Sequence, residues 1–255
     1  MRNIFIFINI FIFINMKIFC SGSCRLLSTI RNTLDIETIH SLEEHYFKGI
    51  NFLGKFHDTK SHIQFIKFIK GEVQLDAENL KNFFTAYNND KWQNIRYFEN
   101  LNTIPLKLHN LKKEINNCDI YIFEICSIRT YKYKGAYCQF EQKENNDISQ
   151  YEITIQDEKE LLDDLYTIRS FFPGKKIIFQ CHFRPNIIYN DEKKAIEKRE
   201  LIYNTLKNFC EKNNCFLYDP SIILQQNNTL FDGDTHFNNR GFNESFNFLY
   251  HNFLT

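Results

Sequence analysis

Two nearly continuous apolar runs constrain the fold of this chain more than any other feature. Residues 118–126 read CDIYIFEIC, and residues 176–181 read KIIFQC. Strands that are apolar at successive positions are buried on both faces, which is typical of a parallel sheet covered by helices on both sides. The two runs therefore predict the interior of an α/β sheet.

Strand and helix patterns alternate from Met16 to the C-terminus, and this alternation predicts the fold class. Further strands are expected over 16–21, near 50–53 and over 215–218. Helices are expected over 24–33, 57–70, 76–87, 108–116, 157–172, 191–212 and from about Gly241. Strands separated by helices indicate an α/β fold, here a three-layer α/β/α sandwich with a mostly parallel, flavodoxin-like sheet.

The chain is expected to form one domain over residues 16–255, with a helical insertion at about 57–116 and a hairpin insertion at about 130–156. Residues 1–15, MRNIFIFINIFIFIN, are a low-complexity hydrophobic tract. Asn9 interrupts this tract, which also ends too early for a membrane span of about 20 residues. We expect a dispensable extension before a start at Met16, with a signal peptide or membrane anchor as the alternative.

Composition excludes several classes of protein. The chain has 31 basic and 31 acidic residues and so lacks the basic excess of a nucleic-acid-binding protein. Its eight cysteines include no CxxC pair for zinc or redox chemistry, which indicates free thiols in a reducing compartment such as the cytoplasm. A membrane-associated or secreted protein is expected only if residues 1–15 act as an anchor or signal. The abundance of Phe and Tyr beside scarce Gly indicates AT-rich coding, as in some protists and large DNA viruses.

The most informative chemical motif is the block DGDTHFNNRG at residues 232–241. A histidine with a nearby carboxylate is what a hydrolase needs as a general base, because the acid fixes the tautomer of the imidazole. His236 is the expected base and Asp234 the orienting acid, with Asp232 as a rival. The Asp-x-Asp pattern lacks the further ligands of a calcium loop, so no metal is expected.

The expected strand over 16–21 ends in a turn, Ser21-Gly22-Ser23-Cys24, that offers a nucleophile. In a parallel α/β sheet, ligands bind beyond the carboxyl ends of the strands, so this turn and the His236 block should meet there. His182, just after residues 176–181, should lie at the same edge, as a substrate contact or as a structural histidine. Each block alone is as consistent with an ordinary turn, but the two together favour an enzyme.

These two blocks resemble those of the SGNH (GDSL-type) hydrolases. The Gly22-Ser23-Cys24 turn is similar to the motif of the GSCFA branch, and the block around Asp234 and His236 is similar to that of polysaccharide O-acetyltransferase-like members. The resemblance covers most of residues 16–255, but only these two end blocks are specific. It implies a Ser/Cys-His-Asp triad that hydrolyses or transfers an acyl ester, without a metal or organic cofactor.

The chain departs from the SGNH pattern at three points. When the turn is aligned with the Gly-x-Ser motif, Cys24 occupies the position of the nucleophilic serine. Ser23 has the residue type of the usual nucleophile but stands one position earlier. We favour Cys24 as the nucleophile. Glu124-Ile-Cys-Ser127 replaces the usual Gly-x-Asn-Asp, so the Asn oxyanion donor is missing. Ser127, or backbone amides near Gly54 and Cys24, are the candidate substitutes. The acid stands two residues before the histidine, a shorter spacing found in acetyltransferase-like relatives.

The sequence therefore predicts an enzyme acting on a small-molecule or carbohydrate ester, most readily an O-acyl group on a sugar. Two alternatives stay open. One is a catalytically inactive relative that binds glycan, which the missing Asn donor favours. The other is a cysteine-dependent acyltransferase or peptidase-like enzyme.

Overall fold

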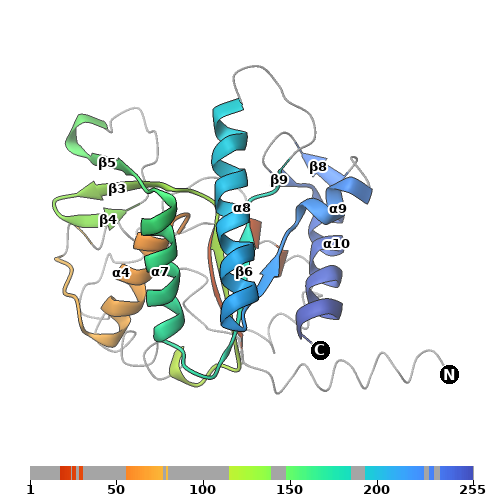
Figure 1. Cartoon of the computed structure of the whole chain (residues 1–255), viewed down its shortest axis with the longest axis horizontal. Helices are drawn as coiled ribbons and strands as arrows, with labels where there is room; N and C mark the ends of the chain where they lie inside the picture. Colours follow the sequence, from red (N-terminus) through yellow and green to blue (C-terminus); the bar gives the residue numbers. More distant parts are fainter. Residues whose placement is uncertain are drawn as a thin grey trace.

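A computed structural model describes residues 18–23, 25–26, 29–30, 56–76, 79, 115–138, 148–184, 193–226, 230–232 and 236–254. Among these residues, strands and helices alternate to give an α/β fold (Figure 1). For residues 193–197, 224–226, 231–232 and 236 only the backbone is described. The tract 1–15, the strand expected near 50–53 and most of the helices expected over 76–87 and 108–116 lie outside the described residues.

The centre of the fold is a four-stranded sheet in the order β1-β2-β6-β7. Its strands are β1 (Ile18–Ser21), β2 (Ile120–Ile125), β6 (Lys176–Cys181) and β7 (Phe216–Tyr218). All neighbouring pairs are parallel. The prediction of an α/β fold with a parallel sheet is confirmed, and the two apolar runs are its two central strands.

Helices cover both faces of the sheet. One face is covered by α4 (Thr59–Lys70), α7 (Glu158–Ser170) and α8 (Lys193–Asn213), and the other by α10 (Asn239–Leu249) and the helical residues 25–26 and 29–30. In Figure 1, α7 and α8 stand in front of the sheet and α10 lies to one side. The predicted three layers are present in the described part of the chain.

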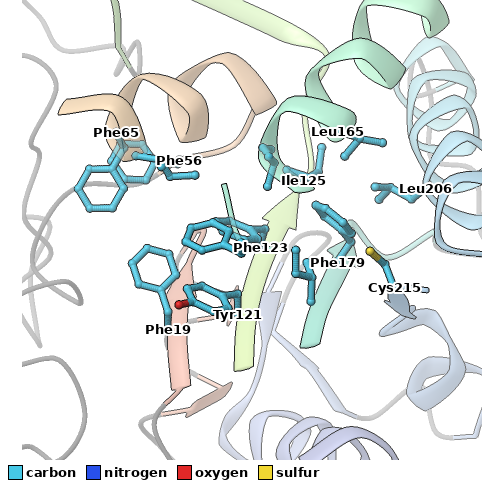
Figure 2. Packing of buried hydrophobic residues seen from close by; sticks show 14 of the residues in the cluster. Phe19, Phe56, Phe65, Tyr121, Phe123, Ile125, Leu165, Phe179, Leu206 and Cys215 are labelled. Atoms are coloured by element: carbon cyan, nitrogen blue, oxygen red, sulfur yellow. The ribbon is translucent and has the colours of Figure 1, made fainter. Parts of the chain in front are cut away.

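Alternate residues of each strand enter two separate cores, which explains the continuous apolar runs. On β2, Tyr121 and Phe123 pack toward α4, α7 and α8, whereas Ile120 and Ile122 pack toward α10. Figure 2 shows the first core, where aromatic rings from β1, β2 and β6 lie together. Tyr121 and Phe172 are stacked with ring centroids 4.0 Å apart. A strand with an apolar residue on each face has no polar side to leave in water.

Side-chain caps set where several helices begin. Asp58 caps α4 by accepting a hydrogen bond from the Ser61 backbone N–H, and Asp157 and Glu160 form a capping box at the start of α7. Asn238 caps α10 in the same way, so this helix begins at Asn239, two residues before the start predicted at about Gly241. A short helix, α9 (Ser221–Gln226), was not expected from the sequence, and the expected terminal helix ends in a single π-turn, η5 (Tyr250–Leu254).

The segment where a hairpin insertion is expected contains a three-stranded antiparallel sheet in the order β4-β3-β5. Its strands are β3 (Arg129–Tyr133), β4 (Ala136–Cys138) and β5 (Glu152–Ile155), with the 3-10 turn η3 (Ile148–Gln150) before β5. Lys134 and Gly135, both at positive φ, make the tight turn between β3 and β4. A separate two-stranded hairpin joins β8 (Phe231–Asp232) to β9 (His236–Phe237).

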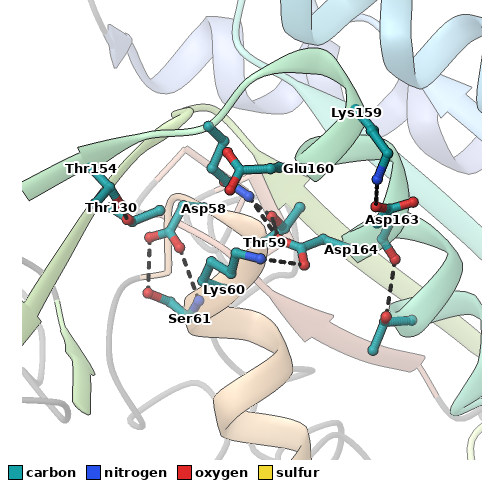
Figure 3. Close-up of polar contacts among 12 residues, drawn as sticks. Asp58, Thr59, Lys60, Ser61, Thr130, Thr154, Lys159, Glu160, Asp163 and Asp164 are labelled. Carbon is teal, nitrogen blue, oxygen red and sulfur yellow. Dashed lines mark hydrogen bonds and ion pairs between the residues drawn. The ribbon is translucent and has the colours of Figure 1, made fainter. Parts of the chain in front are cut away.

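A buried polar cluster joins α4 to α7. The Asp164 carboxylate on α7 accepts hydrogen bonds from Thr59 Oγ1 at 2.7 Å, Lys60 Nζ at 2.8 Å and Gln156 Nε2 at 2.7 Å (Figure 3). Every carboxylate oxygen therefore has a partner, which a buried charge requires. This cluster fixes the two helices against one another on the face of the sheet opposite α10.

Among the described residues, no helix is both long enough and apolar enough to cross a membrane.

The seven cysteines in this part of the chain are free thiols. Six of them are buried, and burial raises the pKa of Cys138 to about 12. Cysteines in such surroundings stay protonated and unreactive at neutral pH.

His62 is a buried histidine on α4 that the sequence does not single out. Its Nε2 lies 3.0 Å from the Glu124 backbone oxygen and its Nδ1 lies 2.9 Å from Ser21 Oγ. A neutral imidazole satisfies both contacts by donating to the carbonyl and accepting from the hydroxyl. Burial lowers the pKa of His62 to about 4, so the imidazole is neutral at pH 7.

We expect the free energy of unfolding to fall by about 2 kcal/mol between pH 7 and pH 4.5 because of His62. The unfolded chain binds a proton below its ordinary pKa of 6.5, whereas the folded chain excludes that proton until the pH approaches 4. His62→Gln should flatten the pH dependence measured by urea denaturation. Buried His182 contributes in the same direction, and Asp58, whose pKa is raised to about 6 by burial, opposes both. An unaltered slope in His62→Gln contradicts the assignment.

Candidate functional site

The turn after β1 lies directly against β2. Gly22 begins this turn, and a Cβ atom at this position would lie 2.6 Å from Glu124 Cβ and 3.1 Å from Leu26 Cδ2. Only a residue without a side chain permits so close an approach. The Ser-Gly-Ser sequence therefore brings the backbone of the turn within reach of the Glu124 carboxylate.

Glu124 binds the residues on both sides of Cys24. Its Oε2 accepts hydrogen bonds from the Ser23 backbone N at 2.7 Å and from Ser23 Oγ at 2.6 Å, and its Oε1 accepts from Arg25 Nε at 2.8 Å. Burial opposes ionisation of this fully buried carboxyl, but Arg25 and the hydrogen bonds from Ser23 outweigh it. The pKa of Glu124 therefore lies below its ordinary value.

Ser23 is a buried ligand of Glu124. Its side chain has no exposed surface, its hydroxyl donates to the carboxylate, and the Arg25 backbone N–H donates to its Oγ at 3.3 Å. A serine nucleophile needs a base to take its proton and an oxygen open to the substrate. In this structure the carboxylate holds the Ser23 proton and protein atoms cover the oxygen.

The residues that directly follow Cys24, His182 and His236 in the chain contact one another. The Arg25 guanidinium lies 5.9 Å from the centre of the Phe183 ring. The Phe183 and Phe237 rings lie with their centroids 5.2 Å apart. The three segments that the sequence predicts at the carboxyl edge of the sheet therefore meet there, although they are far apart in the chain.

A second contact joins the N-terminal turn to the C-terminal helix. Thr29 Oγ1 donates to the Arg25 backbone oxygen at 2.8 Å and to Ser245 Oγ on α10 at 3.3 Å. The Tyr218 hydroxyl at the end of β7 lies 2.5 Å from the same Ser245 Oγ. Because α10 follows the His236 hairpin directly, this network fixes the hairpin relative to the turn.

His182 lies at the end of β6 and is buried. Its Nδ1 lies 2.9 Å from the Phe183 backbone oxygen. Burial, and then the positive charges of Arg25 and Arg199, hold the pKa of His182 well below its ordinary value. A neutral histidine here can donate a hydrogen bond but gives up no proton near pH 7. Gln180, beside Glu124 in the sheet register, has a buried Oε1 that forms no hydrogen bond with any of the described residues.

Ser127, a candidate oxyanion donor, has both of its donors in use. Its backbone N–H donates to the His57 oxygen at 2.8 Å, and its Oγ donates to the Arg129 oxygen at 3.0 Å. The Arg129 N–H returns a bond to the same Oγ at 2.9 Å. The two contacts with Arg129 form a local turn between β2 and β3, and the contact with His57 joins this turn to the segment before α4.

The remaining predicted site residues are described only in part. Cys24, Asp234 and Gly54 lie outside the described residues. The backbone of His236 lies in β9 and pairs with Asp232 in β8, and its side chain is not described. Among the described side chains, no group of three or more His, Cys, Asp or Glu residues is placed to hold a metal ion.

Sequence reasoning missed the role of Glu124. The signal that could have revealed it was a single acidic residue inside a strand that is otherwise apolar on both faces, because such a residue needs a buried partner. It also missed the interactions of Arg184, which follows β6. Arg184 forms ion pairs with Glu200, at 3.1 Å, and with Asp219, and its guanidinium lies 3.5 Å from the centre of the Tyr203 ring. These interactions hold the segment that follows His182 against α8 and the end of β7.

Comparisons with known proteins add little to this geometry. No protein-family model matches the sequence, and no curated protein matches it. The fold is similar to the crystal structure of a carbohydrate acetylesterase family member from Sinorhizobium meliloti, with 10% identity, a TM-score of 0.36, and coverage of 92% of this chain and 95% of that one. A similarity at this level carries no argument about function. The α/β description therefore rests on the strand order and the covering helices.

Proposed function

We propose that the chain hydrolyses or transfers an acyl ester, with Cys24 as nucleophile, His236 as general base and Asp234 as the acid that orients it. The observation that carries the proposal is the contact of Arg25 with Phe183 and of Phe183 with Phe237. Because Arg25 and Phe237 are the chain neighbours of Cys24 and His236, these contacts support a site in which the nucleophile and the base lie together.

The environment of Ser23 favours Cys24 as the nucleophile. The Ser23 hydroxyl is buried and its proton is held by Glu124, so activation would first require this bond to break. Cys24 directly precedes Arg25 in the chain, and residues 25–26 and 29–30 are helical. The positive end of a helix stabilises a thiolate, and a thiolate is the reactive form of cysteine.

In the proposed reaction, the Cys24 sulfur attacks the acyl carbonyl after its proton has passed to His236. The tetrahedral intermediate expels the alcohol, which takes that proton from His236, and a thioester remains on Cys24. Water or a sugar hydroxyl then attacks the thioester, with His236 again removing the proton and returning it to the thiolate. Backbone amides are the proposed oxyanion donors, since the Ser127 N–H already donates to the His57 oxygen and the Ser127 hydroxyl to the Arg129 oxygen. The proposed substrate is an O-acylated carbohydrate.

The test is to trap the acyl-enzyme. Rapid mixing with p-nitrophenyl acetate should release a burst of about one equivalent of p-nitrophenolate, as expected when acylation precedes a slower deacylation. Mass spectrometry of the tryptic peptide Ile18–Arg25 should then find acetyl on Cys24 and lose it after hydroxylamine. Cys20→Ala, which removes the other cysteine of this peptide, should leave the label unchanged. Acetyl on another residue, or release equal to that in buffer together with glycan binding, contradicts the proposal and favours an inactive glycan-binding protein.

A further inference from the structure

The Glu124 carboxylate is bonded to both chain neighbours of the proposed nucleophile. Ser23 contributes two hydrogen bonds, of 2.7 Å and 2.6 Å, and Arg25 contributes one of 2.8 Å. The side chains of Arg25 and Glu124 are 8% and 0% exposed. A buried carboxylate with three donors at these distances fixes its partners in position, because losing any one contact leaves a buried polar group unpaired.

The pair also sets the charge around the turn. Arg25 is positive and Glu124 negative, so together they contribute no net charge next to Cys24. Among the described residues, the other titratable or charged groups that act on this region are His57 before α4, His182 after β6 and Arg199 on α8. His182 is neutral near pH 7 for the reasons given above. Removing either member of the Arg25–Glu124 pair therefore changes the local charge by one unit.

We propose that Glu124 is a positioning residue that anchors the nucleophile turn through Ser23 and Arg25 and offsets the charge of Arg25, the chain neighbour of Cys24. This inference rests on the proposed function only in taking Cys24 as the nucleophile. It gives Glu124 two roles, one in geometry and one in charge. The charge role predicts the direction in which the pKa of the Cys24 thiol shifts, which a merely structural role does not. Removing the negative charge of Glu124 favours the thiolate, and removing the positive charge of Arg25 disfavours it.

The experiment measures the rate of Cys24 alkylation by iodoacetamide against pH, in a Cys20→Ala background, by mass spectrometry of the Cys24 peptide. Glu124→Gln should move the midpoint of the rate profile down by about one pH unit, and Arg25→Gln should move it up by a similar amount. The double variant removes both charges and should bring the midpoint back toward the parent value. Two opposite shifts that cancel are the expected result.

Asp164→Asn is the matched control. Asp164 is also a buried carboxylate with three donors, but it lies between α4 and α7 on the other face of the sheet (Figure 3). This control should lose stability without moving the alkylation midpoint. Equal midpoints in all variants, or shifts of the same sign in both single variants, overturn the charge role.

Ester turnover is measured separately, and the expected loss in Glu124→Gln is about tenfold to a hundredfold in kcat as the turn loses its anchor. Alkylation needs no ester, so a chain that never turns over ester can still show opposite shifts. That outcome refutes the proposed function while supporting the charge role of Glu124. Full turnover in Glu124→Gln overturns the positioning role.

Discussion

Replacing Cys24 by alanine is expected to lower kcat/KM for p-nitrophenyl acetate at least about a thousandfold. Without the thiolate, no acyl-enzyme forms, and only binding and oxyanion stabilisation remain. Ser23→Ala should retain activity within about tenfold, because it removes one of three hydrogen bonds to Glu124 and leaves the proposed nucleophile in place. It should cost about 1.5–3 kcal/mol of stability, as is usual for a hydrogen bond to a charged group.

The two variants are compared by steady-state kinetics at a temperature where both are folded, as judged by circular dichroism. His236→Ala should resemble Cys24→Ala, and the double variant should lose no more than either alone, because the two residues act as one unit. The reverse pattern, in which Ser23→Ala is inactive and Cys24→Ala is active, assigns the nucleophile to Ser23. In that case the Ser23–Glu124 bond must open during the reaction.

The sheet could be predicted because its signal is local. Residues 118–126 and 176–181 are apolar on both faces, and this property is present in the sequence before any partner is known. The helices follow from spacing, and their starts follow from caps such as Asp157 and Asn238. The start of α10 is harder to predict than that of α7, because Gly241, three residues after the Asn238 cap, also resembles a helix boundary.

The less predictable parts depend on pairings between distant residues. β5 pairs with β3 across more than twenty residues, and no local pattern distinguishes this pairing from a simple hairpin. Glu124 and Ser23 are 101 residues apart, so the sequence shows an acidic residue in an apolar strand but not what binds it. The approach of Arg25 and Phe237 to the same Phe183 ring follows a predictable rule, since carboxyl ends of parallel strands share one edge.

Gly241→Ala is expected to lower the free energy of unfolding by about 2–3 kcal/mol and to reduce ester turnover further than this loss alone explains. A Cβ atom at this position in α10 would overlap the Leu230 backbone oxygen and lie 2.7 Å from Phe237 Cδ1. The same Leu230 oxygen accepts a hydrogen bond from the Asn238 N–H at 2.9 Å. The helix therefore cannot accept a methyl group unless it moves away from the β8–β9 hairpin, which carries His236.

Gly174→Ala separates this steric effect from the general cost of replacing a glycine. Gly174 has a φ of +72°, and a Cβ atom added there would meet no other atom within 4 Å. Alanine at this position should therefore cost about 1 kcal/mol through backbone strain and leave turnover unchanged.

Urea denaturation and steady-state kinetics of both variants give the comparison. If Gly241→Ala matches Gly174→Ala in both measurements, α10 does not hold the hairpin in place. A larger loss of turnover in Gly241→Ala instead links the packing of α10 to the position of the proposed base, because this substitution changes no residue of the proposed triad.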